Sequence, residues 1–295
     1  MTVTGQQFPI VAGDHEVIVT EVGAGLRCYR HRDVDVTACY DADVLPPRCA
    51  GAVLVPWPNR LRGGRYRFDA TDYQLALTEP DTGNAIHGLA RWTRWTPVSH
   101  EPARVTLATD VVPQKGYPFE MRVEVTYALD AESGLTVTTS AQNTGSRRAP
   151  FGVGFHPYLS VHGATLDDTV VTVPARERIL VDDAAIPVGV ESVEGTPYDL
   201  RDGRRLGRLR MDDCFTGLEP GGRAEVRAGD SGAQLWFGDV FGYLQVFTPD
   251  VLADGVPAIA VEPMTCPADA FNSTDGLLVI DPGGTWTGSW GITPL

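Results

Sequence analysis

The stretch Met121-Arg-Val-Glu-Val-Thr-Tyr-Ala-Leu129 alternates apolar and polar side chains through its whole length. Successive side chains of a β-strand point to opposite faces of a sheet, so this period of two predicts a strand with one buried face. The stretch Leu135-Thr-Val-Thr-Thr-Ser-Ala141 partly repeats the alternation, and residues 130–134 between them have the composition of a hairpin turn. The two stretches together predict antiparallel β-structure.

Similar strand patterns recur along the chain. Further strands are expected at Glu16–Val22, Arg65–Leu77, Arg104–Val111, Ala233–Phe237, Tyr243–Thr248, Ile259–Glu262 and Leu277–Ile280. The 32 glycines and 22 prolines favour frequent turns, and no long stretch has the 3.6-residue apolar period of a helix. Many short strands with frequent turns predict an all-β sandwich or barrel. Because no linker-like segment or repeat interrupts the pattern, we expect a single domain over residues 1–295, with residues 182–210 as a surface excursion.

The composition excludes several classes of function. A net charge of -14 opposes binding to nucleic acid, which requires clustered Lys and Arg. No apolar run approaches the roughly 18 residues of a membrane span, and the N-terminus lacks the pattern of a secretory signal. The only lysine, Lys115, lies in a turn-like segment and is a poor candidate for Schiff-base chemistry. We therefore expect a cytoplasmic protein that binds neither nucleic acid nor membranes.

The five cysteines do not form a recognisable metal or redox motif. They are Cys28, Cys39, Cys49, Cys214 and Cys266, an odd number without a C-x-x-C pair. This pattern predicts buried free thiols in a reducing compartment and no metal site.

Two ionisable residues interrupt apolar, strand-like stretches. His156 lies in Phe155-His-Pro157, and Glu262 lies in Val261-Glu-Pro263. A buried carboxylate is costly unless it is paired, and burial raises its pKa toward that of a useful general base. Each residue alone also fits a structural role, the histidine bonded to a carbonyl group and the glutamate to backbone amides. As a pair they suit acid–base chemistry on a neutral substrate.

Other polar residues lie in loops that could surround such a pair. Asn59-Arg60 follows a Trp/Pro-rich segment, and an arginine there can donate several hydrogen bonds to hydroxyl groups. His87 follows Asp81-Thr-Gly-Asn84, a segment with the composition of a loop. Trp92 and Trp95 lie just beyond it, where their rings could stack on a sugar or pack in the core. Asp212 and Asp213 are adjacent in sequence, and because adjacent residues of a strand point to opposite faces, at most one of them is expected to face a site.

In its order of Asn-Arg, His-Gly, His, Asp and Glu motifs, the chain resembles the aldose 1-epimerases, the galactose mutarotase family, as a divergent bacterial member. The motifs are Asn59-Arg60 before GGRYRF, His87-Gly88, His156 with Tyr158, Asp212 with Phe215, and Glu262 with Ala268-Asp-Ala-Phe-Asn272. The resemblance extends from about residue 50 to the C-terminus. The sequence departs from the common family pattern at Leu89, Pro157 and Asp213.

The resemblance implies a large antiparallel β-sandwich of the galactose mutarotase-like type, in agreement with the strand pattern. It implies an isomerase that interconverts the α and β anomers of a free aldohexose. Glu262 would take the proton of the anomeric hydroxyl, and His156 would give a proton to the ring oxygen. Asn59, Arg60, His87 and Asp212 would bind the substrate. A small sugar is then the expected partner, no metal or organic cofactor is required, and the protein is expected to be a monomer or a homodimer.

Three alternatives stay open from the sequence. A non-catalytic sugar-binding sandwich would have no need for the pair of His156 and Glu262. A glycosidase could use Asp212 and Glu262 as its two carboxylates, but would leave the histidine unexplained. A hexose-phosphate epimerase would need an arginine cluster, for which Arg60 with Arg62 and Arg65 are the candidates.

Overall fold

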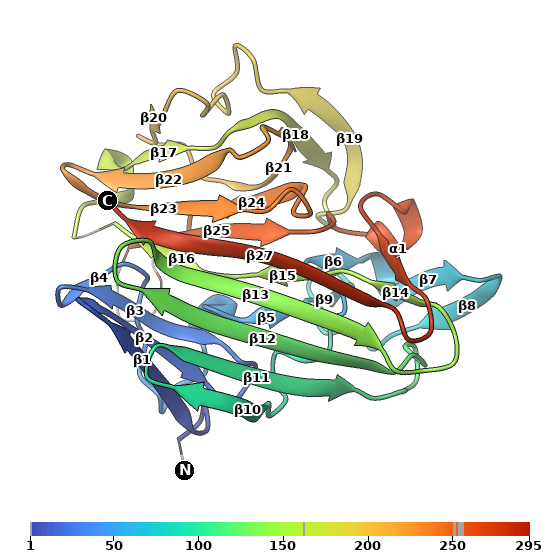
Figure 1. Ribbon diagram of the computed structural model, residues 1–295. Coiled ribbons are helices and arrows are strands. Elements are labelled where there is room, and N and C mark those ends of the chain that lie inside the picture. The colour runs from blue at the N-terminus through green and yellow to red at the C-terminus, as the bar shows by residue number, and fades with distance from the viewer. Residues whose placement is uncertain (1, 162, 250–251, 253–256) are drawn as a thin grey trace.

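The computed structural model describes residues 2–161, 163–249, 252 and 257–295. Two large antiparallel sheets dominate this part of the chain (Figure 1). The first has nine strands among the described residues, in the order β10 (Thr96–Glu101), β11 (Arg104–Val111), β12 (Met121–Asp130), β13 (Gly134–Asn143), β27 (Thr285–Pro294), β23 (Ser231–Phe237), β22 (Arg223–Ala228), β17 (Val170–Thr172) and β20 (Arg204–Arg205).

The second large sheet has eight strands in the described part of the chain. Their order is β19 (Pro187–Ser192), β18 (Ala175–Val181), β21 (Asp212–Leu218), β24 (Tyr243–Phe247), β25 (Ala258–Met264), β15 (Gly154–Phe155) and β5 (Val53–Leu54), with β16 (Tyr158–Ser160) also paired to β25.

Smaller elements extend these two sheets. The N-terminal strands form a four-stranded sheet of β1 (Gln7–Ala12), β2 (His15–Thr20), β3 (Leu26–His31) and β4 (Val34–Asp35). Three two-stranded pairs are β14 (Ala149–Phe151) with β26 (Leu278–Ile280), β6 (Arg60–Leu61) with β9 (Ala85–Ile86), and β7 (Arg65–Phe68) with β8 (Thr71–Gln74). The helical segments of the described residues are short, namely α1 (Ala270–Ser273) and the 3-10 turns Pro47–Cys49, Arg62–Gly64 and Leu166–Asp168.

The main core lies between the inner faces of the two large sheets. Along β12 the buried side chains alternate with partly exposed ones, as the sequence predicts. Phe155 of the second sheet packs on Trp290 of the first, with their ring centroids 5.0 Å apart. Burial of such aromatic and aliphatic side chains supplies most of the favourable free energy of folding.

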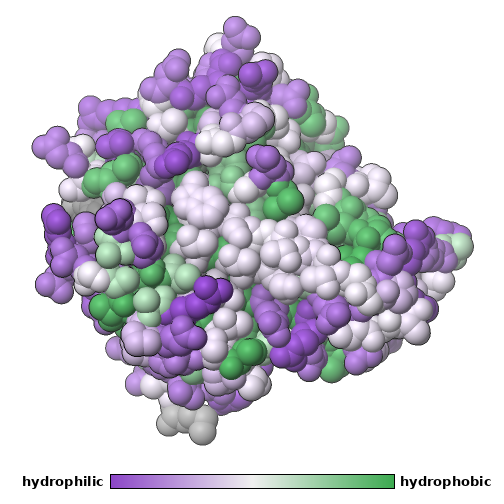
Figure 2. Space-filling view, viewed as in Figure 1, coloured by the Kyte–Doolittle hydropathy of each residue, from purple (hydrophilic) through white to green (hydrophobic). Residues whose placement is uncertain are grey.

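On the outer face of the nine-stranded sheet, small polar side chains lie along β13 and β27, and charged side chains lie along β12 and β22. On it Thr138 of β13 and Ser289 of β27 are hydrogen-bonded across the strands at 2.8 Å. Figure 2 shows the result as a pale band of intermediate hydropathy across the middle of this face, with more hydrophilic groups around it. Such a solvent-facing surface is typical of an antiparallel sheet with one buried face.

The fold confirms the expected all-β sandwich, with two differences in detail. The expected strand over residues 65–77 is a hairpin of β7 and β8, because Asp69 and Ala70 adopt positive φ values of 46° and 62° and reverse the chain. The expectation that residues 182–210 are only a surface excursion is wrong, because β19 pairs with β18 and Leu200 is buried. The backbone of this segment pairs regularly with β18 despite its high content of Gly, Pro and charged residues.

The expectation of free thiols is wrong for two of the five cysteines. Cys28 of β3 and Cys39 form a disulfide, because the turn after β3 brings their Cα atoms to 4.4 Å. Cys49, Cys214 and Cys266 are free, and the last two are buried. No helix in the described part of the chain is long and apolar enough to span a lipid bilayer.

Candidate active site

The register of the second sheet brings His156 and Glu262 together. Gly154 is paired with Met264 and Tyr158 with Ala260, on either side of the His156-Pro157 break between β15 and β16. Continued through that break, the same antiparallel register puts His156 opposite Glu262. Directly opposed residues of an antiparallel pair project from the same face of the sheet. The two side chains therefore face one another across neighbouring strands.

The contact between them is close. Nε2 of His156 lies 3.3 Å from Oε1 of Glu262, and both side chains are buried. Within the described residues, Nδ1 of His156 and Oε2 of Glu262 are buried and have no hydrogen-bond partner. Unpaired buried polar atoms are costly, so they suit a site at which a ligand supplies the missing hydrogen bonds.

Burial shifts both groups toward their neutral forms. It lowers the pKa of His156 to about 3, and the positive charge of Arg91 acts in the same direction. Burial, and then the negative charge of Asp212, raise the pKa of Glu262 well above 4.5, while Arg60 opposes this rise. Burial therefore favours a neutral carboxyl group facing a neutral imidazole. This neutral pair holds the same number of protons as an imidazolium–carboxylate pair.

His87 is held by the backbone of Asn59. The backbone N–H of Asn59 donates to Nδ1 of His87 at 3.2 Å, and the N–H of His87 donates to the carbonyl of Asn59 at 2.9 Å. In the neutral ring the proton is therefore on Nε2, which leaves that N–H available to donate. The rings of His87 and His156 meet edge to face, with centroids 5.6 Å apart. The next residue, Gly88, has a φ of 67°. A Cβ atom at this position would lie 2.0 Å from the carbonyl oxygen of Val55.

Arg60 is fixed by a carboxylate that the sequence analysis missed. Its Nε and Nη2 donate to the two oxygens of Glu79 at 2.8 and 2.9 Å, a bidentate pair of the kind that fixes a guanidinium group in one orientation. Thr82 also donates to Glu79. Nη1 of Arg60 lies 3.4 Å from Oδ1 of Asn59. Glu79 lies in the same loop as the expected turn residues before His87, but its position gave no distinguishing signal.

A second residue missed from the sequence, Gln245, links three strands of the site. It is paired with Glu262 in the register of β24 and β25, and its amide donates to Oδ1 of Asp212 at 2.7 Å. Its carbonyl accepts from Asn59 Nδ2 at 3.3 Å. Asp213 lies on the opposite face of β21 and pairs with Arg178. Asp212 is therefore the aspartate that faces the site.

These side chains line one cavity of about 310 Å³. Its wall includes all six site residues expected from the sequence, namely Asn59, Arg60, His87, His156, Asp212 and Glu262. The other lining residues are Arg48, Cys49, Thr78, Glu79, Ile86, Arg91, Gln245 and Phe247. Trp92 and Trp95 do not line it. Trp95 is buried in the core, and Trp92 is 47% exposed beside the Arg91 guanidinium.

The glycines around His156 have a packing role. A Cβ atom on Gly154 would lie 2.7 Å from Cβ of Pro58, and one on Gly152 would lie 2.5 Å from Sγ of Cys266. They are required where the Trp/Pro-rich segment packs on β15.

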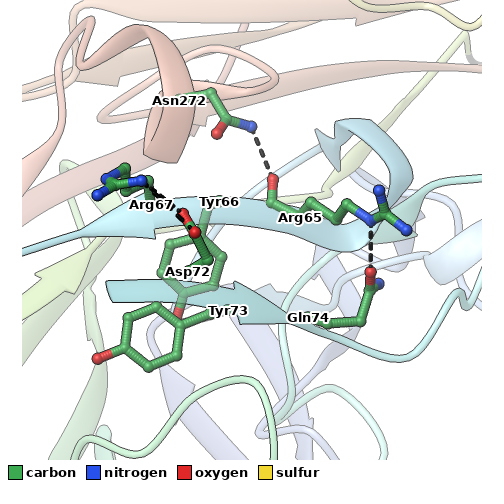
Figure 3. A pocket seen from close by; sticks show the side chains of 7 residues that line it. All are labelled: Arg65, Tyr66, Arg67, Asp72, Tyr73, Gln74 and Asn272. Atoms are coloured by element: carbon green, nitrogen blue, oxygen red, sulfur yellow. Dashed lines mark hydrogen bonds and ion pairs between the residues drawn. The ribbon is translucent and has the colours of Figure 1, made fainter. Parts of the chain in front are cut away.

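Two larger hollows lie at the β7–β8 hairpin, away from His156 and Glu262. Their volumes are about 560 and 770 Å³. Figure 3 shows the first, in which Arg65 is hydrogen-bonded to Gln74, Arg67 is paired with Asp72, and Asn272 donates to the Arg65 carbonyl. Their polar groups are thus satisfied by one another. Arg62 and Arg65 belong to this hairpin region and do not line the cavity of Arg60, so they form no arginine cluster with it.

The fold and the cavity define a class of protein, a β-sandwich with a buried histidine–glutamate pair set among polar side chains that can hydrogen-bond to hydroxyl groups. Comparison with characterised families agrees with this description. A model of the aldose 1-epimerase family matches residues 9–293. The chain is 32% identical over 292 residues to the uncharacterized protein YihR of Escherichia coli, covering 96% of this chain and 91% of that protein.

Two further comparisons point to the same family. Galactose mutarotase of Homo sapiens is 33% identical over 178 residues, a match that spans 57% of this chain and 50% of that protein. The crystal structure of a galactose mutarotase-like protein from Clostridium acetobutylicum superposes with a TM-score of 0.86 at 18% identity, over 97% of this chain and 94% of that one, and so shares the fold. The chain belongs to the aldose 1-epimerase family and is an enzyme of the isomerase class.

Proposed function

We propose that this enzyme interconverts the α and β anomers of a free aldose by opening and reclosing its ring. The observation that carries the proposal is the opposed pair of His156 and Glu262, 3.3 Å apart at the wall of one cavity. Mutarotation needs one group that takes a proton from the anomeric hydroxyl and another that gives a proton to the ring oxygen. These two oxygens are bonded to the same carbon, so the acid and the base must lie close together.

Each step of the reaction is a proton transfer coupled to one carbon–oxygen bond. The Glu262 carboxylate takes the proton of the C1 hydroxyl while protonated His156 gives a proton to the ring oxygen. The bond between C1 and the ring oxygen breaks, and C1 becomes an aldehyde. Rotation about the C1–C2 bond presents the other face of the aldehyde. The ring closes with the two proton transfers reversed, which restores both side chains.

The substrate itself favours the protonation states that this reaction needs. Burial favours neutral His156 and neutral Glu262. Transfer of one proton from the carboxyl group to the imidazole gives the imidazolium and the carboxylate without exchange with solvent. A sugar hydroxyl that donates to the carboxylate, and a ring oxygen that accepts from the imidazolium, both stabilise the charged pair.

The remaining residues of the cavity are suited to hold the sugar. Nε2–H of His87 and the guanidinium of Arg60 can donate to sugar oxygens, and the Asp212 carboxylate can accept from a hydroxyl group. Asn59 positions His87 through its backbone and Gln245 through its side chain. All of these contacts are made from strands or from loops fixed by hydrogen bonds, which favours a preorganised site.

Polarimetry on freshly dissolved sugars tests the proposal. Solutions of α-D-glucose and α-D-galactose change their optical rotation without enzyme, so the quantity measured is the excess rate at several protein concentrations. We expect an excess rate proportional to protein concentration for at least one aldose. A protein that binds a sugar but gives no excess rate would instead be a binding module, and release of a free sugar from a glycoside would indicate a glycosidase.

A further inference from the structure

Two arginines line the cavity that the proposed reaction does not use. Arg48 and Arg91 form part of its wall together with Cys49. Within the described residues, neither arginine has an ion-pair partner, whereas Arg60 of the same cavity is paired with Glu79. An arginine with no carboxylate partner at the wall of a ligand cavity is free to bind an anion.

Arg91 is the less accessible of the two. Its Nη1 is buried and has no hydrogen-bond partner among the described residues. The guanidinium lies 5.6 Å from the Trp92 ring centroid, so an aromatic face supports it on one side. A buried guanidinium N–H without a partner is costly, and an oxyanion in the cavity would satisfy it.

Arg48 is exposed at the rim of the cavity. It lies in the 3-10 turn Pro47–Cys49 at φ 46°, and its guanidinium lies 5.8 Å from the Phe247 ring centroid. Its carbonyl accepts from the Tyr158 hydroxyl at 3.3 Å, and the Tyr158 ring stacks on His156 with centroids 5.0 Å apart. Arg48 is therefore connected through one aromatic ring to the proposed acid.

The charges of the cavity are arranged unevenly. Arg60, Glu79 and Asp212 lie together, and Arg60 and Asp212 both act on the ionisation of Glu262. The charge of Arg91 acts instead on His156 and His87, after the larger effect of burial. With the His156–Glu262 pair counted as neutral, three arginines face two carboxylates. The cavity is thus locally positive in a chain of net charge -14.

We propose that the substrate is an aldose with an oxyanion group on its exocyclic carbon, bound by Arg48 and Arg91. This inference rests on the proposed function, because the roles of His156 and Glu262 orient the sugar. The ring oxygen is bonded to C1 and C5. If C1 faces Glu262 and the ring oxygen faces His156, then C5 and the exocyclic C6 lie beyond the ring oxygen, on the side of the two arginines. A carboxylate, phosphate or sulfonate group shares the chemistry that a guanidinium recognises.

Such a substrate would also favour the reaction. An anion that pairs with Arg91 offsets the positive charge that disfavours protonation of His156. The protonated imidazole is the form that gives its proton to the ring oxygen. Binding of the correct substrate would thus prepare the acid for its role.

The test compares sugars that differ only at C6. Excess mutarotation rates are measured with D-glucose, D-glucuronate, D-glucose 6-phosphate and the 6-sulfonate of 6-deoxy-D-glucose, and with the corresponding galacto sugars. We expect at least one anionic sugar to have a kcat/KM about ten- to hundredfold above that of its neutral parent, the usual effect of a charge-assisted hydrogen bond. The identity of the preferred sugar distinguishes the three oxyanions. Its KM should rise with salt concentration, while that of the neutral parent should not.

Variants tie this preference to the two arginines. Arg91→Gln and Arg48→Gln should each lower the ratio of anionic to neutral kcat/KM about tenfold. Arg91→Lys should keep more of the ratio than Arg91→Gln does, because it keeps the charge. Arg65→Gln, at the hairpin outside the cavity, is the matched control and should keep the wild-type ratio. Thermal melting establishes that each variant is folded.

Two results would overturn the inference while leaving the proposed function in place. One is equal kcat/KM for the neutral sugars and all their anionic counterparts. The other is an anionic preference that survives in both Arg48→Gln and Arg91→Gln. An enzyme that accelerates none of the neutral or anionic sugars would contradict the proposed function itself.

Discussion

Nε2 of His156 lies 3.3 Å from Oε1 of Glu262, and the register of β25 with β15 and β16 puts the two residues opposite one another. Their separation is thus set by backbone pairing in the sheet and does not depend on a mobile loop. Groups built on strands are held more firmly than groups on loops. Prolines follow both residues, and Val261 N–H is hydrogen-bonded to the Pro157 carbonyl at 3.2 Å, which ties the two segments together.

The pair of Arg60 and Glu79 leads to a prediction about substrate binding. Glu79→Gln removes one charge and weakens the bidentate contact that orients Arg60. If Arg60 holds the sugar, KM should rise about tenfold, the usual effect of losing a charge-assisted hydrogen bond, while kcat changes much less. Steady-state polarimetry measures both constants. Asp72→Asn, which breaks the exposed pair of Arg67 and Asp72, is the control. An unchanged KM in folded Glu79→Gln would remove Arg60 from the substrate-binding set.

His87 should make the stability of the protein depend on pH. Burial lowers the pKa of His87 well below 6.5, and repulsion by His156 when it is protonated and by the charges of Arg91 and Arg60 acts in the same direction. Below about pH 6.5 the unfolded chain binds a proton at this position that the folded chain does not bind, so folding becomes less favourable as the pH falls. This contribution approaches about 1.4 kcal/mol per pH unit for one histidine. His87→Asn removes it.

The measurement is the free energy of unfolding in urea between about pH 7 and about pH 5. The wild type should lose more stability over this range than His87→Asn does. Parallel curves for the two proteins would mean that His87 is protonated equally in the folded and unfolded states. His100→Asn is a suitable control, because its ring lies on an exposed strand.

The disulfide between Cys28 and Cys39 should stabilise the N-terminal sheet. The two residues are 11 positions apart, and closing a loop of this length in the unfolded chain is worth about 3 kcal/mol in the chain-entropy description. Cys28→Ser should lower the free energy of unfolding by about 2–3 kcal/mol. Cys214→Ser alters a free thiol and serves as the comparison. Mass spectrometry of peptides from unreduced protein should show residues 28 and 39 linked, and two free thiols there would contradict the structure.

The absence of a metal from the proposed mechanism stays a prediction. Both bond changes in the reaction are proton transfers between the sugar and side chains, so no Lewis acid is required. Excess mutarotation should therefore survive extensive dialysis against a chelator. Activity that disappears on dialysis and returns with a divalent ion would require a metal step in the mechanism.

The periodicity of the sequence predicts the fold well where a strand has one buried face. Met121–Leu129 alternates clearly and corresponds closely to β12, and the strand expected at Arg104–Val111 is β11. The expected strand at Arg65–Leu77 fails because the reversal at Asp69 and Ala70 uses positive φ values that neither residue type signals strongly. The sequence pattern did not predict β19, because β19 is an exposed edge strand and has no buried face to produce a clear alternation of apolar and polar residues.

The candidate site is predicted only in part. His156 and Glu262 stand out because each is an ionisable residue in an apolar stretch, and both line the cavity. Gln245 carries a similar signal, a polar residue inside a strand of apolar neighbours, and could have been found in this way. Glu79 and Arg91 lie in loops, where charged residues are ordinary, so only their contacts in three dimensions distinguish them. The single domain over residues 1–295 and the oligomeric state stay predictions.

The central claim is that Glu262 takes the proton of the anomeric hydroxyl, and the most direct test is the turnover of Glu262→Gln. The amide keeps the size of the side chain and can occupy the same position opposite His156, but it cannot take a proton at neutral pH. With a melting temperature close to that of the wild type, this variant should turn over about 10²–10⁴ times more slowly, the usual contribution of a positioned acid or base, while sugar binding changes much less. Turnover near the wild-type value in the folded variant would contradict the assignment of Glu262 as the base.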